Sequence, residues 1–219
     1  MIHKKRSFRI GTLSFHVFST SDPNADRRPP FVLIPGIGMS HRYLTRLHDL
    51  LSQTGPVYSI DMPGFGGLPK PPESVGVPEM AQALGRVLDL LGIRQAVLIG
   101  HSMGTQWAVG LRIDSLGEPV SGNLLVFSDY LRCGQSWFLS QMRHMLAYRI
   151  EDRVWDLHAP LLILRGGRDR IVGMGWCRRL RQEAHPAALV TVPGHGHLVQ
   201  RTAPRAVASA IQAFVSPDT

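Results

Sequence analysis

The sequence predicts an α/β protein built on a mostly parallel sheet, and three observations carry this prediction. Short strand-like runs alternate with amphipathic helical segments along the chain. One apolar run ends in the pentapeptide 100–104, Gly-His-Ser-Met-Gly, and a helix-compatible segment follows it directly. Five of the predicted strands are followed at once by loops rich in glycine, proline, aspartate or histidine. Because the carboxyl ends of parallel strands meet at one edge, these loops are expected to converge on one crevice.

Eight strand-like runs and five helical segments make up the predicted order. The first two runs flank Gly11-Thr12 and are expected to form an antiparallel hairpin. The helical segments have apolar residues at three- and four-residue spacing. The predicted strands are Ser7–Ile10, Leu13–Ser19, Phe31–Ile34, Val57–Ile60, Ala96–Ile99, Asn123–Phe127, Leu161–Leu164 and Ala188–Val192, and the predicted helices are Tyr43–Leu51, Pro78–Leu91, Thr105–Asp114, Trp176–Ala184 and Pro204–Phe214.

Length and composition predict a single globular domain over residues 1–219. The chain has 219 residues, of which 44% are hydrophobic and 18% charged. No apolar stretch approaches the ~18 residues that a membrane span needs, and Met1–Ile10 has no signal-peptide core. We therefore expect a cytoplasmic protein without stable membrane insertion. Cys133 and Cys177 form no paired motif and are interpreted as packing residues.

The net charge of +8 is carried mostly by arginine. Such a charge can attract anionic substrates or surfaces. The arginines are scattered, however, without interleaved aromatic residues or a nucleic-acid-binding module. We expect a solvated basic surface and no nucleic-acid partner. The oligomeric state remains open.

Ser102 has the surroundings of a catalytic nucleophile. Gly100 and Gly104 leave room for a sharp, strained turn between strand and helix, which exposes the serine hydroxyl. The N–H of Met103 would lie at the helix N-terminus, where it could stabilise an oxyanion. A second donor is expected from the loop after Phe31–Ile34, where Gly36 and Gly38 let the Ile37 N–H approach closely.

A serine nucleophile needs a base and a carboxylate that orients the base. His197 is the predicted base and Asp169, in the Gly-Gly-Arg-Asp turn after Leu161–Leu164, the predicted acid. Two alternatives remain. His195 could replace His197, and Asp129, after Asn123–Phe127, could replace Asp169. The histidine pair also suggests a metal site, but no motif supplies a third ligand, so no metal is expected.

These motifs, together with Asp-Met-Pro-Gly-Phe-Gly at 61–66, make the chain resemble the α/β-hydrolase fold superfamily, as a serine esterase- or lipase-like member with a short cap. The resemblance covers nearly the whole chain. It implies an eight-stranded, mostly parallel sheet flanked by helices, a triad of Ser102, His197 and Asp169, and an oxyanion hole at Ile37 and Met103. It also implies hydrolysis through an acyl-enzyme without a cofactor.

The segment at about 130–159 is short where many relatives insert a helical cap. Its apolar stripe predicts a lid helix over the crevice, with Trp137, Phe138 and Met142 as tentative substrate-binding residues. Packing of that helix on the sheet explains the stripe equally well.

The predicted function is a serine hydrolase that acts on a small or medium carboxylic ester, lactone or thioester, with a small acyl compound as its partner. Two alternatives stay open. The same triad could cleave a carbon–carbon bond or make peracids without a cofactor, or the protein could bind a ligand without turning it over.

Overall fold

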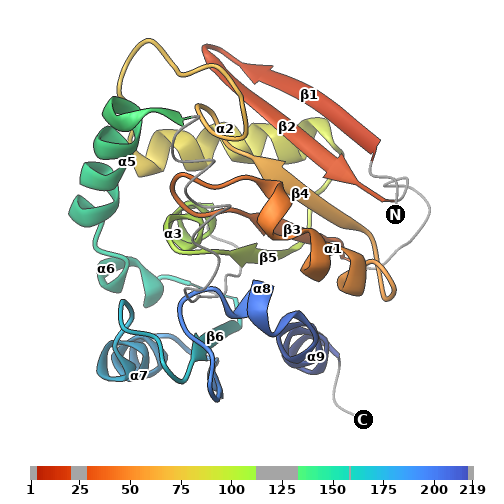
Figure 1. Ribbon diagram of the computed structural model, residues 1–219, viewed down its shortest axis with the longest axis vertical. Coiled ribbons are helices and arrows are strands. Elements are labelled where there is room, and N and C mark those ends of the chain that lie inside the picture. The colour runs from red at the N-terminus through yellow and green to blue at the C-terminus, as the bar shows by residue number, and fades with distance from the viewer. Residues whose placement is uncertain (1–3, 21–28, 112–132, 158, 217–219) are drawn as a thin grey trace.

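Seven strands form two sheets in the part of the chain that the computed structural model describes, residues 4–20, 29–111, 133–157 and 159–216 (Figure 1). The larger sheet has the strand order β1-β2-β4-β3-β5, and the smaller one pairs β6 with β7. The strands are β1 (Lys4–Ile10), β2 (Leu13–Ser19), β3 (Phe31–Ile34), β4 (Val57–Asp61), β5 (Val97–Gly100), β6 (Leu161–Gly166) and β7 (Ala187–Val192).

The pairing is antiparallel at the start of the larger sheet and parallel from β4 onward. β1 and β2 form the predicted hairpin, with Ile10 opposite Leu13 and Gly11 at φ +58° in the turn. β2 pairs antiparallel with β4, whereas β3 lies parallel to both β4 and β5, and β6 lies parallel to β7. The predicted strand Asn123–Phe127 lies outside the described residues, so the eight-stranded sheet stays a prediction.

The helices follow the predicted order with small shifts at their ends. The predicted helix Tyr43–Leu51 is split into a 3-10 turn and α1, and the predicted helix Thr105–Asp114 starts two residues earlier, at Met103. Residues 112–114 lie outside the described range. The helical elements are η1 (His41–Tyr43), α1 (Thr45–Leu51), α2 (Val77–Leu90), α3 (Met103–Gly110), α5 (Gln135–Ala147), α6 (Glu151–Val154), α7 (Met174–Glu183), α8 (Val199–Thr202) and α9 (Pro204–Val215).

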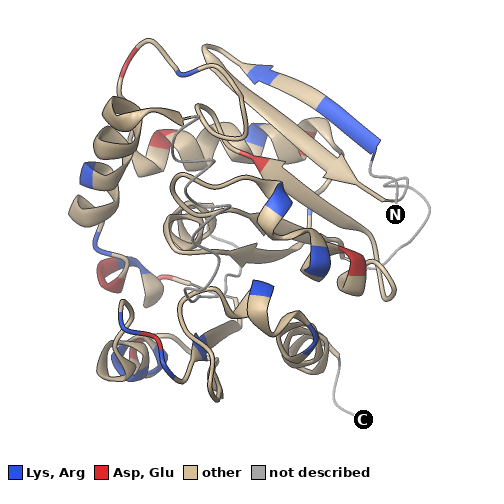
Figure 2. Ribbon diagram, viewed as in Figure 1, with Lys and Arg blue, Asp and Glu red and all other residues tan. Residues whose placement is uncertain are grey.

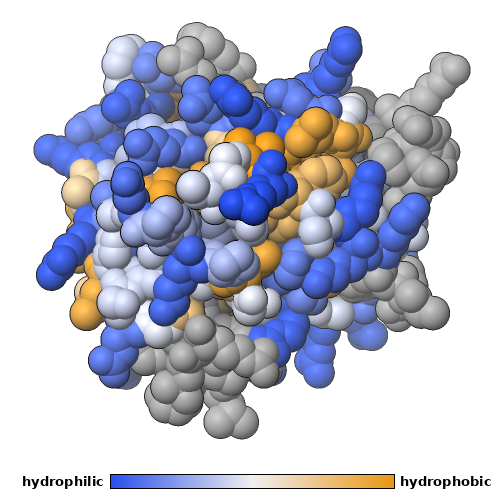
Figure 3. All heavy atoms as spheres, turned by 90° about the horizontal axis from the view of Figure 1, so that it is seen from above, coloured by the Kyte–Doolittle hydropathy of each residue, from blue (hydrophilic) through white to orange (hydrophobic). Residues whose placement is uncertain are grey.

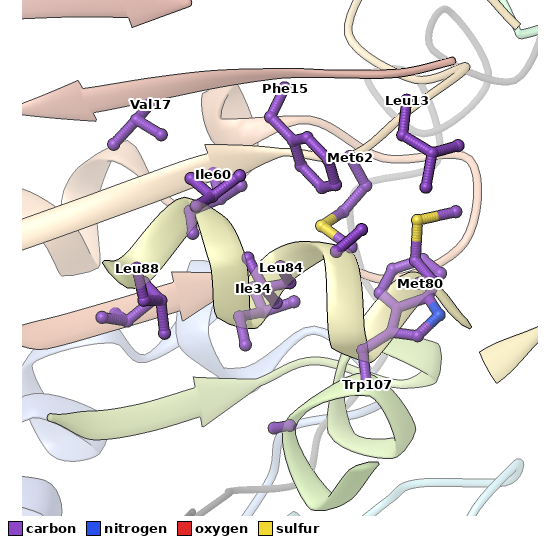
Figure 4. Close-up of a cluster of buried hydrophobic side chains, with 14 of the residues drawn as sticks. Leu13, Phe15, Val17, Ile34, Ile60, Met62, Met80, Leu84, Leu88 and Trp107 are labelled. Carbon is purple, nitrogen blue, oxygen red and sulfur yellow. The ribbon is translucent and has the colours of Figure 1, made fainter. Parts of the chain in front are cut away.

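Strand β3 divides its side chains between two hydrophobic layers. Val32 and Ile34 belong to the cluster with α2 and α3, and Phe31 and Leu33 to the cluster with α1 and α9. This alternation follows from the two-residue period of a strand, and burial on both faces explains why the run is continuously apolar. In Figure 4, side chains of β2, β3 and β4 face Met80, Leu84 and Leu88 of α2 and Trp107 of α3.

The carboxyl ends of the parallel strands are level with one another. Ile34 at the end of β3 pairs with Gly100 at the end of β5. In the smaller sheet Gly166 pairs with Val192, the last residues of β6 and β7. The loops that carry the predicted site residues therefore leave each sheet at the same height.

The charged residues are spread over the molecule. Figure 2 shows Lys and Arg on β1, α5, α6, α7 and α9 rather than in one cluster. On the face seen in Figure 3, hydrophilic residues cover most of the described surface and a hydrophobic area lies among them. Within residues that the structure describes, no helix is both long and apolar enough to span a lipid bilayer.

Candidate active site

Ser102 occupies the turn between β5 and α3 in a strained backbone conformation. Its φ of 49° and ψ of −119° make it the only non-glycine residue with positive φ in the described part of the chain. Such a conformation costs about 1–3 kcal/mol and persists only where the surrounding packing imposes it. The side chain is partly exposed, although His101 and Met103 on either side are buried. The turn therefore presents the serine hydroxyl as the motif predicts.

Two glycines make this turn possible because a side chain would collide with backbone at either position. A Cβ on Gly100 would lie 2.5 Å from Cα of Thr105, and one on Gly104 would lie 2.6 Å from the carbonyl oxygen of Pro35. Contacts under 3.0 Å with backbone cannot be relieved by turning a side chain. The two glycines thus let β5, α3 and the loop after β3 approach each other at Ser102.

His197 lies beside Asp169, as the sequence predicts for a base and its orienting acid. Nδ1 of His197 is 3.0 Å from Oδ2 and 3.2 Å from Oδ1 of Asp169. Both residues are buried. When Nδ1 carries the proton and donates it to the carboxylate, Nε2 of the neutral ring is the acceptor. The pair can therefore hold the imidazole in the tautomer that a general base requires.

The Asp169 carboxylate is held by three donors. Besides His197, the N–H groups of Ile171 and Val172 donate to Oδ1 at 2.8 and 3.0 Å. Burial would raise the pKa of this carboxyl, but the hydrogen bonds from His197, Val172 and Ile171 outweigh it and hold the pKa below its usual value. The Asp169 carboxyl therefore stays ionised at neutral pH.

Arg165, a buried residue near the end of β6, braces the same loop. Its guanidinium donates to the carbonyl oxygens of Val172 and Asp169 at 2.8 Å each, and to that of Gly167 at 3.4 Å. A planar guanidinium offers several donors in a fixed arrangement, which suits three carbonyls of one turn. Arg165 thus fixes the backbone that carries Asp169.

The loops that carry Asp169 and His197 are joined by direct backbone contact. The N–H of Arg168 donates to the carbonyl of His195 at 2.8 Å, and the N–H of Gly167 to that of Val192 at 2.8 Å. A Cβ on Gly166 would lie 2.5 Å from the carbonyl oxygen of Gly196. These contacts between the loop after β6 and the loop after β7 therefore fix the distance between Asp169 and His197.

The two predicted oxyanion donors lie at the start of α3 and in the turn after β3. Met103 is the first residue of α3, and Ile37 lies in the tight turn that the Met39 N–H closes on the Gly36 carbonyl at 3.1 Å. Gly38 has φ +74°, and Gly104 packs against the carbonyls of Ile34 and Pro35. No hydrogen bond from the N–H of Ile37 or Met103 is found within residues 4–20, 29–111, 133–157 and 159–216.

Asp61 contacts the segment that follows Ile37, which the motif at 61–66 does not predict. Its carboxylate accepts the His41 N–H at 2.6 Å and contacts His41 Nδ1 at 2.9 Å. The His41 ring also stacks on Phe18, with ring centroids 3.6 Å apart. Asp61 therefore ties the end of β4 to the segment that follows Ile37.

Ser102 and His197 line the same cavity, which has a volume of about 200 Å³. Its wall is mostly apolar, and Thr105 and Gln106 add polar groups from α3. An engineered cavity of about 150 Å³ binds benzene, so this space suits a small or medium apolar group. The remaining wall consists of Val109, Met145, Ile150, Val154, Leu161, Ile163, Leu164, Ile171, Val172, Trp176, Cys177 and Leu180.

The three tentative substrate-binding residues lie on α5, away from that wall. Trp137 is buried against Gly64, with its ring 6.3 Å from that of Phe65, and Phe138 packs on Gly38 in the loop of Ile37. Met142 is partly buried. Of this helix, Met145 is the residue that lines the cavity. Contact of Trp137, Phe138 and Met142 with substrate stays a prediction.

The alternatives for acid and base fare differently. His195 shares a hydrogen bond with Thr202, Nδ1 to Oγ1 at 3.0 Å, and does not line the cavity. Asp129 lies outside the described residues.

Cys177 also lines the cavity. Burial raises the pKa of its thiol, so it contributes an uncharged group to the wall. Within the described residues, no group of three His, Cys, Asp or Glu side chains could hold a metal ion.

Sequence reasoning overlooked Gln106 and Arg165. Gln106 lines the cavity one helical turn after Ser102, and its Nε2 donates to the carbonyls of Met145 and Tyr148. A glutamine four residues after the predicted nucleophile belongs to no motif, so only the structure identifies it. For Arg165 there is a signal in the sequence, since a charged residue inside an apolar strand is seldom buried without partners.

His101 is expected to make the protein lose stability as the pH falls below about 6.5. Burial lowers the pKa of His101 well below that value, the neighbouring His197 lowers it further, and Asp169 opposes the shift. As the pH falls, the unfolded chain therefore takes up a proton at His101 that the folded chain does not take up. The free energy of unfolding decreases by up to about 1.4 kcal/mol per pH unit as a result. Urea unfolding of wild type and His101→Gln from pH 8 to pH 5 measures the difference.

The variant keeps the other histidines, so only the contribution of His101 is removed. Above pH 7.5 the two stability curves should run parallel, and below pH 6.5 the wild-type curve should fall more steeply. Parallel curves over the whole range would show that folding does not lower the pKa of His101.

Two family models match the chain. One, described as alpha/beta hydrolase fold, matches residues 29–109, which include the Ser102 turn. The other, described as TAP-like protein, matches residues 130–217, which include Asp169 and His197. The chain is also similar to the solved enol-lactonase of Burkholderia xenovorans LB400, with a TM-score of 0.86, 14% identity and coverage of 97% of this chain and 100% of that one. At this identity the likeness concerns the fold.

Curated relatives are similar over part of their length. A putative carbamate hydrolase, RutD, of Enterobacter cloacae is 30% identical over 142 residues, which are 64% of this chain and 49% of that protein. An uncharacterized protein of Mycobacterium tuberculosis is 31% identical over 151 residues, or 64% of this chain and 52% of that protein. The chain thus spans about half the length of these relatives.

Proposed function

Because the chain belongs to the α/β-hydrolase superfamily, we propose that it is a serine hydrolase that cleaves carboxylic esters, lactones or thioesters through an acyl-enzyme on Ser102. One observation carries the proposal. Ser102, whose backbone is strained, lines the same cavity as His197. Nδ1 of His197 lies 3.0 Å from the Asp169 carboxylate. A nucleophile, a base and an orienting acid are thus available to one bound substrate.

The proposed reaction has two steps. Oγ of Ser102 attacks the substrate carbonyl carbon while His197 takes the hydroxyl proton, and the N–H groups of Ile37 and Met103 donate to the oxyanion. The carbon–leaving-group bond breaks, and His197 passes the proton to the leaving group. Water then attacks the acyl-enzyme, with His197 as base, and the acid is released. Asp169 holds the imidazole in place throughout.

The cavity favours a substrate with an apolar acyl group of small or medium size. A volume of about 200 Å³ is below the roughly 300–1,000 Å³ of pockets that enclose a drug-sized ligand. Its mostly hydrocarbon wall offers little to a charged acyl group. Long acyl chains would have to extend beyond it. In the proposed reaction the acyl part therefore occupies the cavity and the leaving group lies at its mouth.

Labelling with a fluorophosphonate probe tests the proposal. The probe should modify the wild-type protein in a 1:1 ratio, and mass spectrometry should find the label on Ser102. Ser102→Ala should take up no label and should hydrolyse no p-nitrophenyl butyrate. Ser136→Ala, a change at an exposed serine on α5, should behave as wild type. Folded wild-type protein that neither reacts with the probe nor hydrolyses any ester of a graded series would refute the proposal.

A further inference from the structure

The buried hydroxyl group of Tyr43 accepts a hydrogen bond from the loop that carries Ile37. The N–H of Gly36, the residue before Ile37, donates to this oxygen at 3.1 Å. Tyr43 is the last residue of η1 and is only 4% exposed, so its side chain is packed back onto the loop after β3. The proposed acyl-enzyme reaction gives this hydroxyl group no part.

Both backbone polar groups of Gly36 are engaged. Its N–H donates to Tyr43, and its carbonyl oxygen accepts from the Met39 N–H at 3.1 Å. The peptide unit between Gly36 and Ile37 is trans and planar, so the N–H of Ile37 points away from the side to which the Gly36 carbonyl points. The orientation of Gly36 therefore sets the direction of the Ile37 N–H, and Tyr43 and Met39 hold that orientation together.

Tyr43 also contacts the turn that carries Ser102. Its ring meets the ring of His101 edge-on, with the two centroids 4.9 Å apart. Gly36 packs against the same imidazole, because a Cβ at Gly36 would collide with Nδ1 of His101. Tyr43 thus touches both the residue before Ser102 and the residue before Ile37. It links the position of the nucleophile to that of the oxyanion donor.

We propose that Tyr43 is a positioning residue, whose hydroxyl group anchors Gly36 and thereby directs the Ile37 N–H toward the oxygen of the bound carbonyl group. This inference rests on the proposed function and goes beyond it, since Tyr43 does not line the cavity and acts through Gly36. A preorganised donor is effective because it needs no reorientation when the negative charge develops. Without the hydroxyl group, the Gly36 N–H would lose its partner and the loop would turn to find another.

Tyr43→Phe tests this role because it removes one oxygen atom and leaves the ring in contact with His101. With p-nitrophenyl butyrate, kcat/KM should fall about 10- to 100-fold and mostly through kcat, as a part of the roughly 10²- to 10³-fold loss that follows removal of an oxyanion donor. Tyr58→Phe is the matched control. Tyr58 is a buried tyrosine of β4 that does not line the cavity, so this variant should keep the kcat/KM of wild type.

Two ketone inhibitors separate oxyanion positioning from a general disturbance of the site. Pentyl trifluoromethyl ketone forms a tetrahedral adduct with a serine nucleophile, and the adduct oxygen requires the oxyanion donors, whereas pentyl methyl ketone binds as the planar ketone. Tyr43→Phe should raise the Ki of the trifluoromethyl ketone by the factor by which kcat/KM falls and leave the Ki of the methyl ketone unchanged. An equal loss of affinity for both ketones would overturn the proposal.

Hydrogen exchange of the Gly36 N–H is a second measurement, which does not depend on the folding of a variant. In the wild-type protein, nuclear magnetic resonance should show slow exchange at this amide, because it donates to a buried oxygen. Exchange should become faster in folded Tyr43→Phe and stay slow in Tyr58→Phe. Exchange in the wild type at the rate of an exposed glycine would overturn the proposal without any variant.

The outcomes separate this inference from the proposed function. A Tyr43→Phe protein with the kcat/KM and the trifluoromethyl ketone affinity of wild type would overturn the role of Tyr43 and leave the serine hydrolase intact. Wild-type protein that shows neither hydrolysis nor fluorophosphonate labelling would instead contradict the function itself, and this inference with it.

Discussion

Asp169→Asn is expected to lower kcat about 10⁴-fold, because the amide no longer holds His197 in the tautomer that accepts the serine proton. In the wild type the carboxylate accepts from His197 Nδ1 and from two backbone N–H groups at once. Asparagine offers one oxygen in place of two, and its NH₂ group faces the imidazole or the backbone donors. Steady-state hydrolysis of p-nitrophenyl butyrate measures the loss.

The same measurement on Asp129→Asn decides between the two candidate acids. If Asp169 is the acid, Asp129→Asn keeps activity within a few-fold of wild type. An Asp169→Asn protein that stays folded and retains most of its activity, with the loss appearing in Asp129→Asn, would transfer the role to Asp129. Comparison of the near-ultraviolet circular dichroism of both variants with wild type guards against a mere folding defect.

Gly104→Ala is expected to destabilise the folded protein by about 3 kcal/mol or more. The added methyl group would meet the carbonyl oxygens of Ile34 and Pro35, which belong to the backbone at the end of β3. Either α3 must move away from the sheet or the loop of Ile37 must shift, and both changes disturb the Ser102 turn. For a chain of this size the loss corresponds to a fall in Tm of about 6–12 °C.

Gly175→Ala provides the matched control, since it adds the same methyl group near the start of another helix, α7. A Cβ at Gly175 has no atom within 4 Å and the residue is not in a positive-φ conformation. Alanine should therefore stabilise that helix by about 0.5 kcal/mol. A thermal melt of Gly104→Ala that overlaps the wild-type melt would contradict the packing described for the Ser102 turn.

The sequence predicts the strands closely because their physical signals are local. Phe31–Ile34 is apolar throughout since both its faces are covered, and the observed β3 has the same bounds. The hairpin at Gly11 and the start of β6 at Leu161 are likewise found where glycine or proline interrupts an apolar run. The helix ends are less well predicted. The helix of Ser102 begins at Met103 because the strained turn leads straight into it.

The contact between His197 and Asp169 agrees with the predicted strand order, because both residues come after neighbouring parallel strands, although strand order by itself leaves Asp129 and His195 open. The composition of the cavity wall does not follow from the sequence, since side chains of α3, α5, α6, β6 and α7 form it together and these elements are far apart along the chain. The apolar stripe of α5 illustrates the difficulty. It contains Trp137, which packs on Gly64, and Met145, which lines the cavity, and nothing in the pattern separates the two.

The separate attachment of the proposed nucleophile and of the proposed proton relay has a consequence for how activity would fail. Asp169 and His197 stand on interlocked loops after β6 and β7, whereas Ser102 stands on the turn after β5. A small shift of these loops relative to that turn would leave the contact between His197 and Asp169 intact and carry the Ser102 hydroxyl out of its reach. Activity would then be lost in a molecule whose secondary structure is still complete.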